Sequence, residues 1–372
     1  MRLAAVALGV AGVLALSWAL VEHQGSRQNA DPSVASTPVG TGDLLTPAQE
    51  RELHRIADLG YIAGRTAARE ATGVVRHDAS AAHAGYTLFT YARGPEAVLI
   101  NMDGSVQHVW SRVGSSYWAR AHLYPNGDLL IITSDPYRLM KIDRNSNVLW
   151  IYEKPAHHDF DVMEDGSIWV LVREATTRAH IHGGTWLLDD VLFRLDPAGR
   201  ELERVSLLEA FERTEIYRDW ITEGELPEGT DILHTNSVEV QEGGRRALVS
   251  IRSLGAIAMI ELNTARVEWV VRGPWRMQHE AQLVDGNLLV FDNLGLGDQS
   301  RVIEVELETS AIIWFYTEPG FFSRGAGAQQ RLANGNILIS ESESGRIVEV
   351  TPAGDVVWEF VNPRTVEDGR ET

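Results

Sequence analysis

The feature that most constrains the fold is a segment that recurs six times and in most copies ends in tryptophan. Each copy reads as an alternating strand, a polar turn and a second strand, which is typical of an antiparallel hairpin. Three copies read AVLINMDGSVQHVW, YRLMKIDRNSNVLW and GRIVEVTPAGDVVW. The copies end at Trp110, Trp150, Glu203 (in place of tryptophan), Trp269, Trp314 and Trp358, with spacings of 40, 53, 66, 45 and 44 residues.

A second hairpin, with a tight Asx-Gly turn, precedes most copies. Examples are LYPNGDLLIIT, VMEDGSIWVLV and RLANGNILISE. Each unit therefore holds four short strands over about 40 to 65 residues, which is typical of a propeller blade. We predict an all-β fold, a six-bladed β-propeller over residues 85–364, with five or seven blades as alternatives. A β-sandwich would not explain the fixed order of the repeat, and the tryptophans are expected to pack between blades.

The first blade lacks a preceding hairpin, so its inner strands must come from the end of the chain or from residues 85–91. The beginning of the chain has a different character. Residues 3–21 carry no charge and are long enough to span a bilayer, and they also resemble a secretory signal. The predicted organisation is a signal anchor or signal peptide at 1–22, a flexible linker at 23–45, a helical N-terminal segment at 46–84 and a C-terminal tail at 365–372.

This organisation predicts a protein at the cell membrane, held there by its N-terminal helix, with the propeller on the periplasmic or extracytoplasmic side. The formal net charge of −19, from 33 basic and 52 acidic residues, argues against nucleic acid as a partner. The chain has no cysteine, which excludes disulfides, thiolate metal sites and a cysteine nucleophile.

In a propeller the first strand of each blade lines the central channel. A single histidine on such a strand is most simply explained by contact with water. Several histidines in successive blades, together with Asn236 and Arg252, favour a shared site. The histidines on this strand or at its mouth are His122, His157, His158, His234 and His279.

From about residue 85 to residue 363 the chain resembles the bacterial arylsulfotransferases that work without phosphoadenosine phosphosulfate. The segments that carry the resemblance are HHD, HTNS followed by IRS, QHEAQLVDGNLLVFDN, and FFSRGAGAQQRLANGNILISESESGRIVEVTPAGDVVWEFVNP. The chain has no cysteine for the disulfide of the characterised enzymes and no room for their N-terminal β-domain. The likeness is therefore to the shorter, membrane-anchored members.

The resemblance implies a six-bladed propeller with the active site in its channel, where one histidine becomes transiently sulfated. It also implies a small aromatic sulfate donor and a phenolic acceptor as partners, with no metal and no cofactor. By position the catalytic residues are His279 as nucleophile, His234, Arg252 and His158, and Asn236 matches a further functional position of the family. The residues of this chain add His122, Tyr117 and Asn293 to Asn236 as substrate-binding candidates.

These residue types suit sulfuryl transfer. A neutral imidazole can attack sulfur and hold the group, and the planar fork of Arg252 can stabilise the sulfuryl oxygens. Histidines such as His234 and His158 can exchange protons with the phenols. The main alternative is a non-catalytic envelope propeller that acts as a binding or scaffold protein. A third possibility is a metal site of three histidines, although Arg252 would then lie beside a cation.

Overall fold

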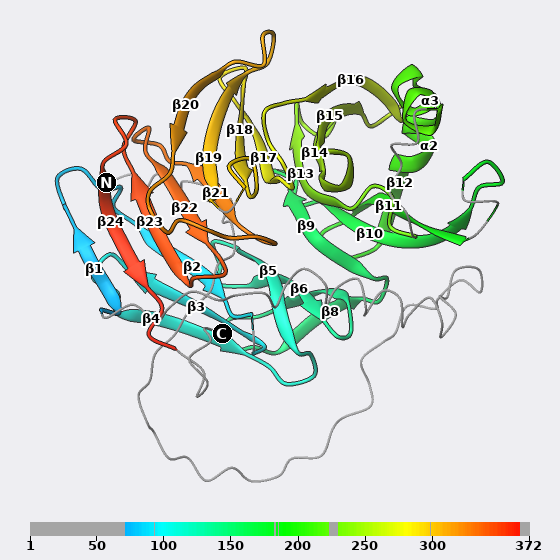
Figure 1. The fold of residues 1–372 in the computed structure, drawn as a ribbon. Coiled ribbons are helices and arrows are strands. Elements are labelled where there is room, and N and C mark those ends of the chain that lie inside the picture. Colours follow the sequence, from blue (N-terminus) through cyan, green and yellow to red (C-terminus); the bar gives the residue numbers. More distant parts are fainter. Residues whose placement is uncertain are drawn as a thin grey trace.

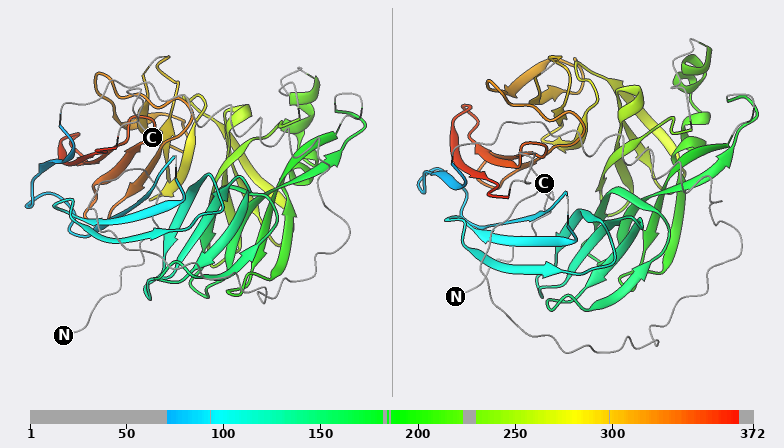
Figure 2. Two further views of the ribbon diagram at one scale, coloured as in Figure 1. Left: turned by 90° about the horizontal axis from the view of Figure 1, so that it is seen from below. Right: turned by 60° about the horizontal axis from the view of Figure 1, so that its bottom comes forward.

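The computed structural model describes residues 71–364, except 93, 182, 183, 185, 223–229 and 298. In this part of the chain the strands form six antiparallel sheets, arranged as a ring around one axis (Figure 1). The two further views in Figure 2 show the same ring from other directions. The prediction of an all-β, six-bladed propeller is confirmed. We number the sheets as blades 1 to 6 in chain order.

Each blade is a meander whose first strand is innermost and whose later strands lie successively further from the axis (Figure 1). Blade 1 has three strands, β2 (Tyr86–Thr90), β3 (Glu96–Asn101) and β4 (Val106–Ser111). Blade 2 has β5 (Tyr117–Leu123), β6 (Leu129–Ser134), β7 (Arg138–Ile142) and β8 (Val148–Tyr152). Blade 3 has β9 (Ala156–Val162), β10 (Ile168–Thr177), β11 (Trp186–Leu195) and β12 (Glu201–Ser206).

The second half of the ring follows the same plan. Blade 4 has β13 (Thr235–Gln241), β14 (Arg246–Ile251), β15 (Ala256–Glu261) and β16 (Arg266–Arg272). Blade 5 has β17 (His279–Val284), β18 (Asn287–Asp292), β19 (Arg301–Glu306) and β20 (Ile312–Tyr316). Blade 6 has β21 (Ala328–Arg331), β22 (Ile337–Glu341), β23 (Arg346–Val350) and β24 (Val356–Val361), with β1 (Gly73–His77) at its outer edge.

Blade 1 takes its inner strand from residues 86–90, which is one of the two sources expected from the sequence. The sequence predicted a helical segment over residues 46–84. Residues 46–70 of this segment lie outside the described residues. Residues 71–84 are described, and they contain a strand instead of a helix. Residues 73–77 form the strand β1, which pairs antiparallel with β24. The physical reason is that the outer edge of β24 offers unpaired backbone groups, and β1 satisfies them. The N-terminal strand thereby joins the last blade, next to the first.

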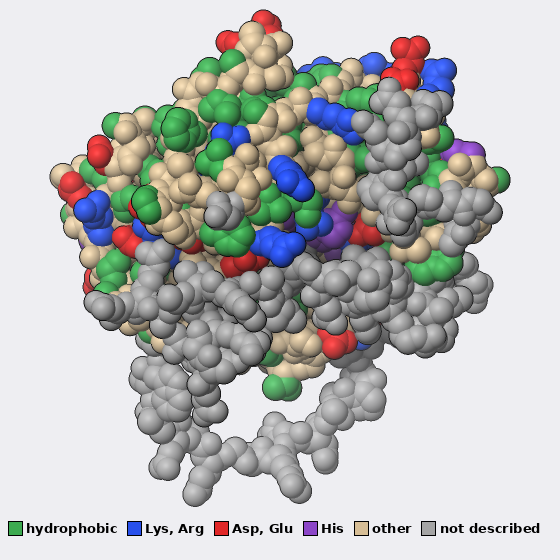
Figure 3. All heavy atoms as spheres, in the orientation of Figure 1, with side chains coloured by type: hydrophobic (Ala, Val, Ile, Leu, Met, Phe, Trp, Pro, Cys, Tyr) green, Lys and Arg blue, Asp and Glu red, His purple; other side chains and the backbone are tan. Residues whose placement is uncertain are grey.

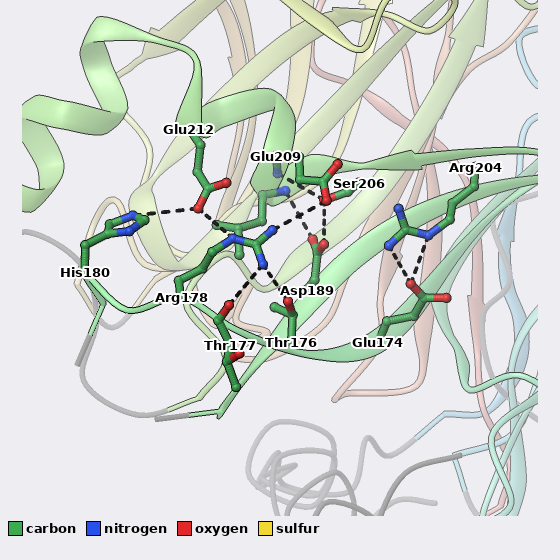
Figure 4. A network of polar contacts seen from close by, with 11 residues as sticks. Glu174, Thr176, Thr177, Arg178, His180, Asp189, Arg204, Ser206, Glu209 and Glu212 are labelled. Carbon is green, nitrogen blue, oxygen red and sulfur yellow. Dashed lines mark hydrogen bonds and ion pairs between the residues drawn. The ribbon is translucent and has the colours of Figure 1, made fainter. Parts of the chain in front are cut away.

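Blade 3 carries an insertion that accounts for the widest spacing in the repeat. The helices α2 (Leu207–Glu212) and α3 (Glu215–Thr222) follow β12, and a 3₁₀ turn, η2 (Arg252–Leu254), follows β14. Polar contacts fasten the long β10–β11 hairpin to α2 (Figure 4). Asp189 accepts from the backbone N–H of Leu208 at the start of α2 (3.1 Å), and Arg178 pairs with Glu212 at its end (2.7 Å). The insertion is therefore part of the folded blade.

The hydrophobic core is divided among the interfaces between blades. The buried apolar residues form six clusters, and each cluster combines side chains from two neighbouring blades. The cluster between blades 3 and 4 also contains apolar residues of α2 and α3, among them Phe211 and Trp220. This distribution follows from the alternation in each strand, because both faces of a blade are covered by its neighbours.

The repeated tryptophans lie on the last strand that each blade takes in chain order, and three of them donate a hydrogen bond to the next blade. The indole N–H of Trp110 donates to the carbonyl of Gly127 (3.3 Å), and that of Trp150 donates to Pro197 (3.2 Å). Trp358 donates to the carbonyl of Met102 (2.9 Å), which connects blade 6 to blade 1. The tryptophans thus contribute packing and a hydrogen bond between blades, as expected for an aromatic ring with one polar atom.

Side chains replace the missing backbone partners along the inner strands. The innermost strand of a blade has a neighbour on one side only, so its other N–H groups need acceptors. Asp159 and Asp161 on β9 accept from the N–H groups of Val238 and Val240 on β13 (2.9 and 2.7 Å). Ser237 and Glu239 on β13 accept in the same way from Ala281 and Leu283 on β17 (3.1 and 2.8 Å). Neighbouring inner strands are therefore aligned by polar side chains.

The predicted signal anchor at 1–22, the linker at 23–45 and the tail at 365–372 lie outside the described residues. Among the residues that are described, no helix has the length and apolar character needed to cross a membrane.

Replacement of Trp358 by alanine tests the role of the outer tryptophans. This ring is 1% exposed, so Trp358→Ala should lower the free energy of unfolding by about 3–5 kcal/mol, the usual cost of removing a buried aromatic side chain. Trp314 donates a similar hydrogen bond, to Pro352 (2.9 Å), but its side chain is only half-buried. Trp314→Ala is thus the matched control and should cost clearly less in urea unfolding. Equal losses would contradict burial as the cause.

Candidate active site

The inner strands of blades 2 to 5 are each interrupted near their beginning. The pairing register shifts between Trp118 and Arg120 of β5, and at the corresponding places of β9, β13 and β17. His158, His234 and Glu280, at or beside these shifts, have φ values of 54°, 49° and 49°. Bulges re-aim side chains, and left-handed residues other than glycine are often found at functional sites. The irregularities coincide with the histidines.

Three histidines and one arginine come together where these strands begin. His158 is on β9, His234 directly precedes β13, His279 is the first residue of β17, and Arg252 directly follows β14. The ring centroids of His158 and His234 are 5.0 Å apart. The backbone N–H of Arg252 donates to the carbonyl of His234 (3.3 Å). Arg252 and His234 are both close enough to His279 to affect its pKa, and His279 and His234 are close enough to His158 to affect the pKa of that ring. The structure thus brings the four predicted catalytic residues into one electrostatic cluster.

His279 is held in one tautomer by Asn293. The amide nitrogen of Asn293 donates to the carbonyls of Ser323 and Ala326 (2.6 and 2.8 Å), so its oxygen faces the imidazole. The Nδ1 atom of His279 lies 2.8 Å from that oxygen and 3.1 Å from the carbonyl of Met277. Both neighbours are acceptors, so Nδ1 must carry the hydrogen. The Nε2 atom then has a lone pair.

His279 is also kept neutral. Burial, followed by the charge of Arg252, lowers its pKa to about 3, and the hydrogen bond to Asn293 offsets only part of this effect. The side chain is 7% exposed. A neutral imidazole with a free Nε2 lone pair is the form that can act as a nucleophile.

His234 is held by an aspartate from its own loop. Its Nδ1 atom lies 2.6 Å from Oδ2 of Asp231, and its backbone N–H donates to Oδ1 of the same carboxylate (3.1 Å). Burial opposes ionisation of Asp231, but Arg173 and His234 dominate and hold the pKa of this carboxyl below its usual range. His234 therefore donates from Nδ1 to an ionised acceptor.

His157 and His158 form a pair on β9. Their Nδ1 atoms are 2.8 Å apart, so one donates and the other accepts. Burial, followed by the charge of His234, lowers the pKa of His158 well below its ordinary value. Burial also lowers the pKa of His157, although Asp190 opposes this effect. The two rings are therefore neutral near pH 7.

Asn236 is oriented by a backbone carbonyl. Its amide nitrogen donates to the carbonyl of Gln278 (2.7 Å), next to His279. The side chain is 4% exposed, and its oxygen has no hydrogen-bond partner among the described residues. This oxygen is a free acceptor in the histidine cluster. On one face of the molecule, histidine side chains reach the surface near the middle, beside basic and acidic side chains (Figure 3).

A comparison with protein families now identifies the group. The profile of the arylsulfotransferases (ASST) matches residues 120–363. The chain belongs to the arylsulfotransferase family. The match spans the histidine cluster and supports sulfotransferase activity at the level of the family. It confirms the resemblance seen in the sequence.

Comparisons with curated sequences and with solved structures give information on the fold. No curated protein sequence matches the chain. A protein of unknown function from Bacteroides caccae is 16% identical with a TM-score of 0.50, over 72% of this chain and 90% of that one. A streptogramin B lyase is 14% identical with a TM-score of 0.43, over 79% of this chain and 83% of that one. At such identity the first likeness concerns the fold alone.

The other three predicted substrate-binding residues of this arylsulfotransferase-family chain lie on β5 or directly after β18. His122 lies further along β5, where burial and then Arg120 lower its pKa to about 4. Tyr117 is the first residue of β5 and is half-buried. Asn293 is fully buried behind His279, with both ends of its amide bound to protein atoms. Their roles toward substrate stay predictions.

Arg120 on β5 connects the inner strands of three blades. Its guanidinium makes two hydrogen bonds to Glu280 on β17 (both 2.8 Å), and its Nε atom lies 3.0 Å from Asp159 on β9. A polar cavity of about 350 Å³ adjoins these ion pairs, and His122 lines it, whereas His158, His234 and His279 do not. In the described part of the chain, no group of three or more histidines and carboxylates is arranged to hold a metal ion.

Sequence reasoning missed the residues that support the cluster. Asp231 contacts His234, Asp190 contacts His157, and Arg173 pairs with both aspartates. Arg120 connects three blades. The sequence signal for Asp231 is its place three positions before His234, in the segment DILHTN. Arg173 and Asp190 occur inside strands that otherwise look apolar, and a charge there indicates a buried partner.

The lowered pKa of His279 predicts a pH-dependent stability. Between its ordinary pKa of 6.5 and the folded value of about 3, the unfolded chain binds a proton that the folded chain does not. Stability should therefore fall as the pH falls below 6.5, by about 1.4 kcal/mol per pH unit from this one group. His279→Asn removes this contribution. In urea unfolding, the free energy of unfolding of the variant should therefore rise relative to that of wild type as the pH is lowered from 7 to 5. Parallel curves for both proteins would contradict the burial of a neutral imidazole.

Proposed function

We propose that this chain transfers a sulfuryl group from an aryl sulfate to a phenol through a sulfohistidine at His279. The observation that carries the proposal is the state of that ring: its Nδ1–H donates to Asn293 (2.8 Å), so that Nε2 keeps its lone pair. The membership of the chain in the arylsulfotransferase family supports the choice of a sulfuryl group.

The reaction has two steps. Nε2 of His279 attacks the sulfur of the donor, the N–S bond forms, and the S–O bond to the aryl group breaks. The phenolate leaves and takes a proton, either from a neighbouring acid or from water. The acceptor phenol then loses its proton to a base, its oxygen attacks the sulfur, and the N–S bond breaks. The sulfuryl group is conserved throughout, and His279 returns to its first state.

Arg252 and the two other histidines would supply charge and protons. The charge of Arg252 reaches the ring of His279, so its guanidinium is placed to stabilise the sulfuryl oxygens. His158 and His234, whose rings are 5.0 Å apart, are the candidates for proton exchange with the phenols. The free oxygen of Asn236 can accept a hydrogen bond from the incoming hydroxyl.

We also propose that the propeller acts outside the cytoplasm and that residues 3–21 anchor it to the cell membrane. The support is the uncharged, apolar character of this segment and its length. In that location the substrates would be small phenols and aryl sulfates that reach the cell envelope.

Trapping the intermediate tests the nucleophile. With an aryl sulfate donor and no acceptor, peptide mass spectrometry should find one added sulfuryl group on the peptide that contains His279. His279→Ala should abolish both the label and the transfer, because no covalent carrier remains. His108→Ala removes a histidine from the outer strand β4 and serves as the control with unchanged transfer.

The other outcomes separate the alternatives. A label on His158 or His234 would show that another histidine is the nucleophile. Transfer by His279→Ala at the wild-type rate, without a label, would show direct transfer between substrates. A folded wild-type protein that transfers sulfate from no aryl sulfate would favour the non-catalytic scaffold.

Replacement of Arg252 by lysine tests the stabilisation of the sulfuryl oxygens. The lysine keeps the positive charge but loses the planar fork, so kcat should fall by roughly 10²-fold or more, as for other losses of a transition-state donor. The label on His279 should still form, more slowly, in a rapid-quench measurement. A rate within twofold of wild type would mean that the charge alone, or another group, stabilises the transition state.

A further inference from the structure

A buried arginine lies behind the histidine cluster and joins two aspartates. Arg173 on β10 is 3% exposed. Its Nη2 atom lies 2.9 Å from Oδ2 of Asp231, which precedes β13, and its Nε atom lies 3.7 Å from Oδ1 of Asp190 on β11. Asp190 also accepts from the backbone N–H of Thr235 at the start of β13 (2.6 Å). We call Arg173, Asp231 and Asp190 the buried clamp.

Each aspartate of the buried clamp faces a different histidine. Asp231 Oδ2 lies 2.6 Å from Nδ1 of His234, and Asp190 Oδ1 lies 3.3 Å from Nε2 of His157. A carboxylate only accepts, so His234 carries its hydrogen on Nδ1. The contact between His157 and Asp190 is longer and lacks hydrogen-bond geometry, and neither of its two atoms has a hydrogen-bond partner among the described residues. A hydrogen on Nε2 of His157 is favoured there because two lone pairs would otherwise face each other.

The state of His157 determines that of His158. With its hydrogen on Nε2, neutral His157 has a lone pair on Nδ1, and this atom lies 2.8 Å from Nδ1 of His158. His158 must then donate from Nδ1, which leaves a lone pair on its own Nε2. The chain of contacts runs from Asp190 through His157 to His158 and ends in the same tautomer that His234 adopts.

We propose that the buried clamp is a positioning device that holds the hydrogens of His158 and His234 on Nδ1, so that both rings present Nε2 as a proton acceptor. This inference rests on the proposed sulfuryl transfer only for the use made of the two rings, since the tautomers themselves do not require any activity. The clamp would act mainly on the second step, in which a base removes the proton of the acceptor phenol.

An amide cannot replace the carboxylate of Asp231. Oδ1 accepts from the backbone N–H of His234, and Oδ2 accepts from both the imidazole of His234 and the guanidinium of Arg173. In Asp231→Asn, either orientation of the amide places its NH₂ group against a donor. If the amide keeps its oxygen on the backbone N–H, its NH₂ group faces Nδ1 and drives the hydrogen of His234 to Nε2.

The test is nitrogen-15 NMR of protein labelled at histidine, recorded at a pH at which the rings are neutral, with His158→Gln and His234→Gln used to assign the signals. In wild type, both rings should show a protonated Nδ1 and a bare Nε2. Asp231→Asn should move the hydrogen of His234 to Nε2. Asp190→Asn should change the signal of His158 and leave that of His234.

The matched control is Glu359→Gln on β24. Glu359 also pairs with a buried arginine, Arg346 (2.7 Å, 3% exposed), but in blade 6 and away from the histidines. This variant should leave both tautomers and the transfer rate as in wild type. Asp231→Asn should lower kcat by about 10²-fold or more while the KM for the donor changes by less than threefold, the range expected for losing a general base.

Several outcomes overturn the inference. The inference is wrong if NMR of wild type finds the hydrogen of neutral His234 or His158 on Nε2, and this result does not depend on whether Asp231→Asn folds. A folded Asp231→Asn with wild-type tautomers, or with losses equal to those of Glu359→Gln, also overturns it. If wild type shows the expected tautomers but transfers no sulfuryl group, the proposed function fails and the clamp remains.

Discussion

The rest of the structure depends on how the inner strands of the propeller satisfy their unpaired edges. Each innermost strand has a backbone partner on one side only, and an unpaired buried N–H is costly. Between blades 3, 4 and 5, side chains of the preceding inner strand accept from these N–H groups, as Asp159 does from Val238 and Glu239 from Leu283. This requirement explains why strands that could be wholly apolar carry acids. It also sets the relative height of the strands, and thereby the height at which the histidines meet.

Bulges at the start of the same strands convert that alignment into a site. A regular strand would alternate its side chains between two faces, whereas the shift at His279 and the left-handed backbone of His158 and His234 re-aim them. Asn293 and Asp231 then determine which nitrogen of His279 and of His234 carries the hydrogen. The cluster is therefore polar, with neutral rings at His158 and His279 and with charges placed behind it, which suits nucleophilic attack followed by proton transfer.

The sequence predicted the fold well because each blade of a propeller is formed by short strands and turns that follow one another along the chain. Alternation, Asx-Gly turns and the recurring tryptophan are each visible within a few residues, and Trp110, Trp150 and Trp358 do contact the next blade. The prediction that the segment before residue 85 is helical was wrong for residues 73–77, which form the strand β1. The strand β1 pairs with β24 across nearly the whole length of the chain, and short-range patterns carry no information about such a contact. The predicted catalytic residues do come together, whereas their chemical roles stay predictions.

By itself the sequence determined the class of fold, the number of blades and the residue types available for chemistry, because strand periodicity and composition are local properties. Only the tertiary structure decided which of these residues share a site. His122 seemed equivalent to His158 in the sequence, yet His122 lines the polar cavity beside Arg120, whereas the ring of His158 lies against that of His234. The charged groups behind the histidines come from other strands, as Arg173 on β10 and Asp190 on β11 do. Protonation in a buried site depends on such distances between distant segments, and a linear pattern does not contain them.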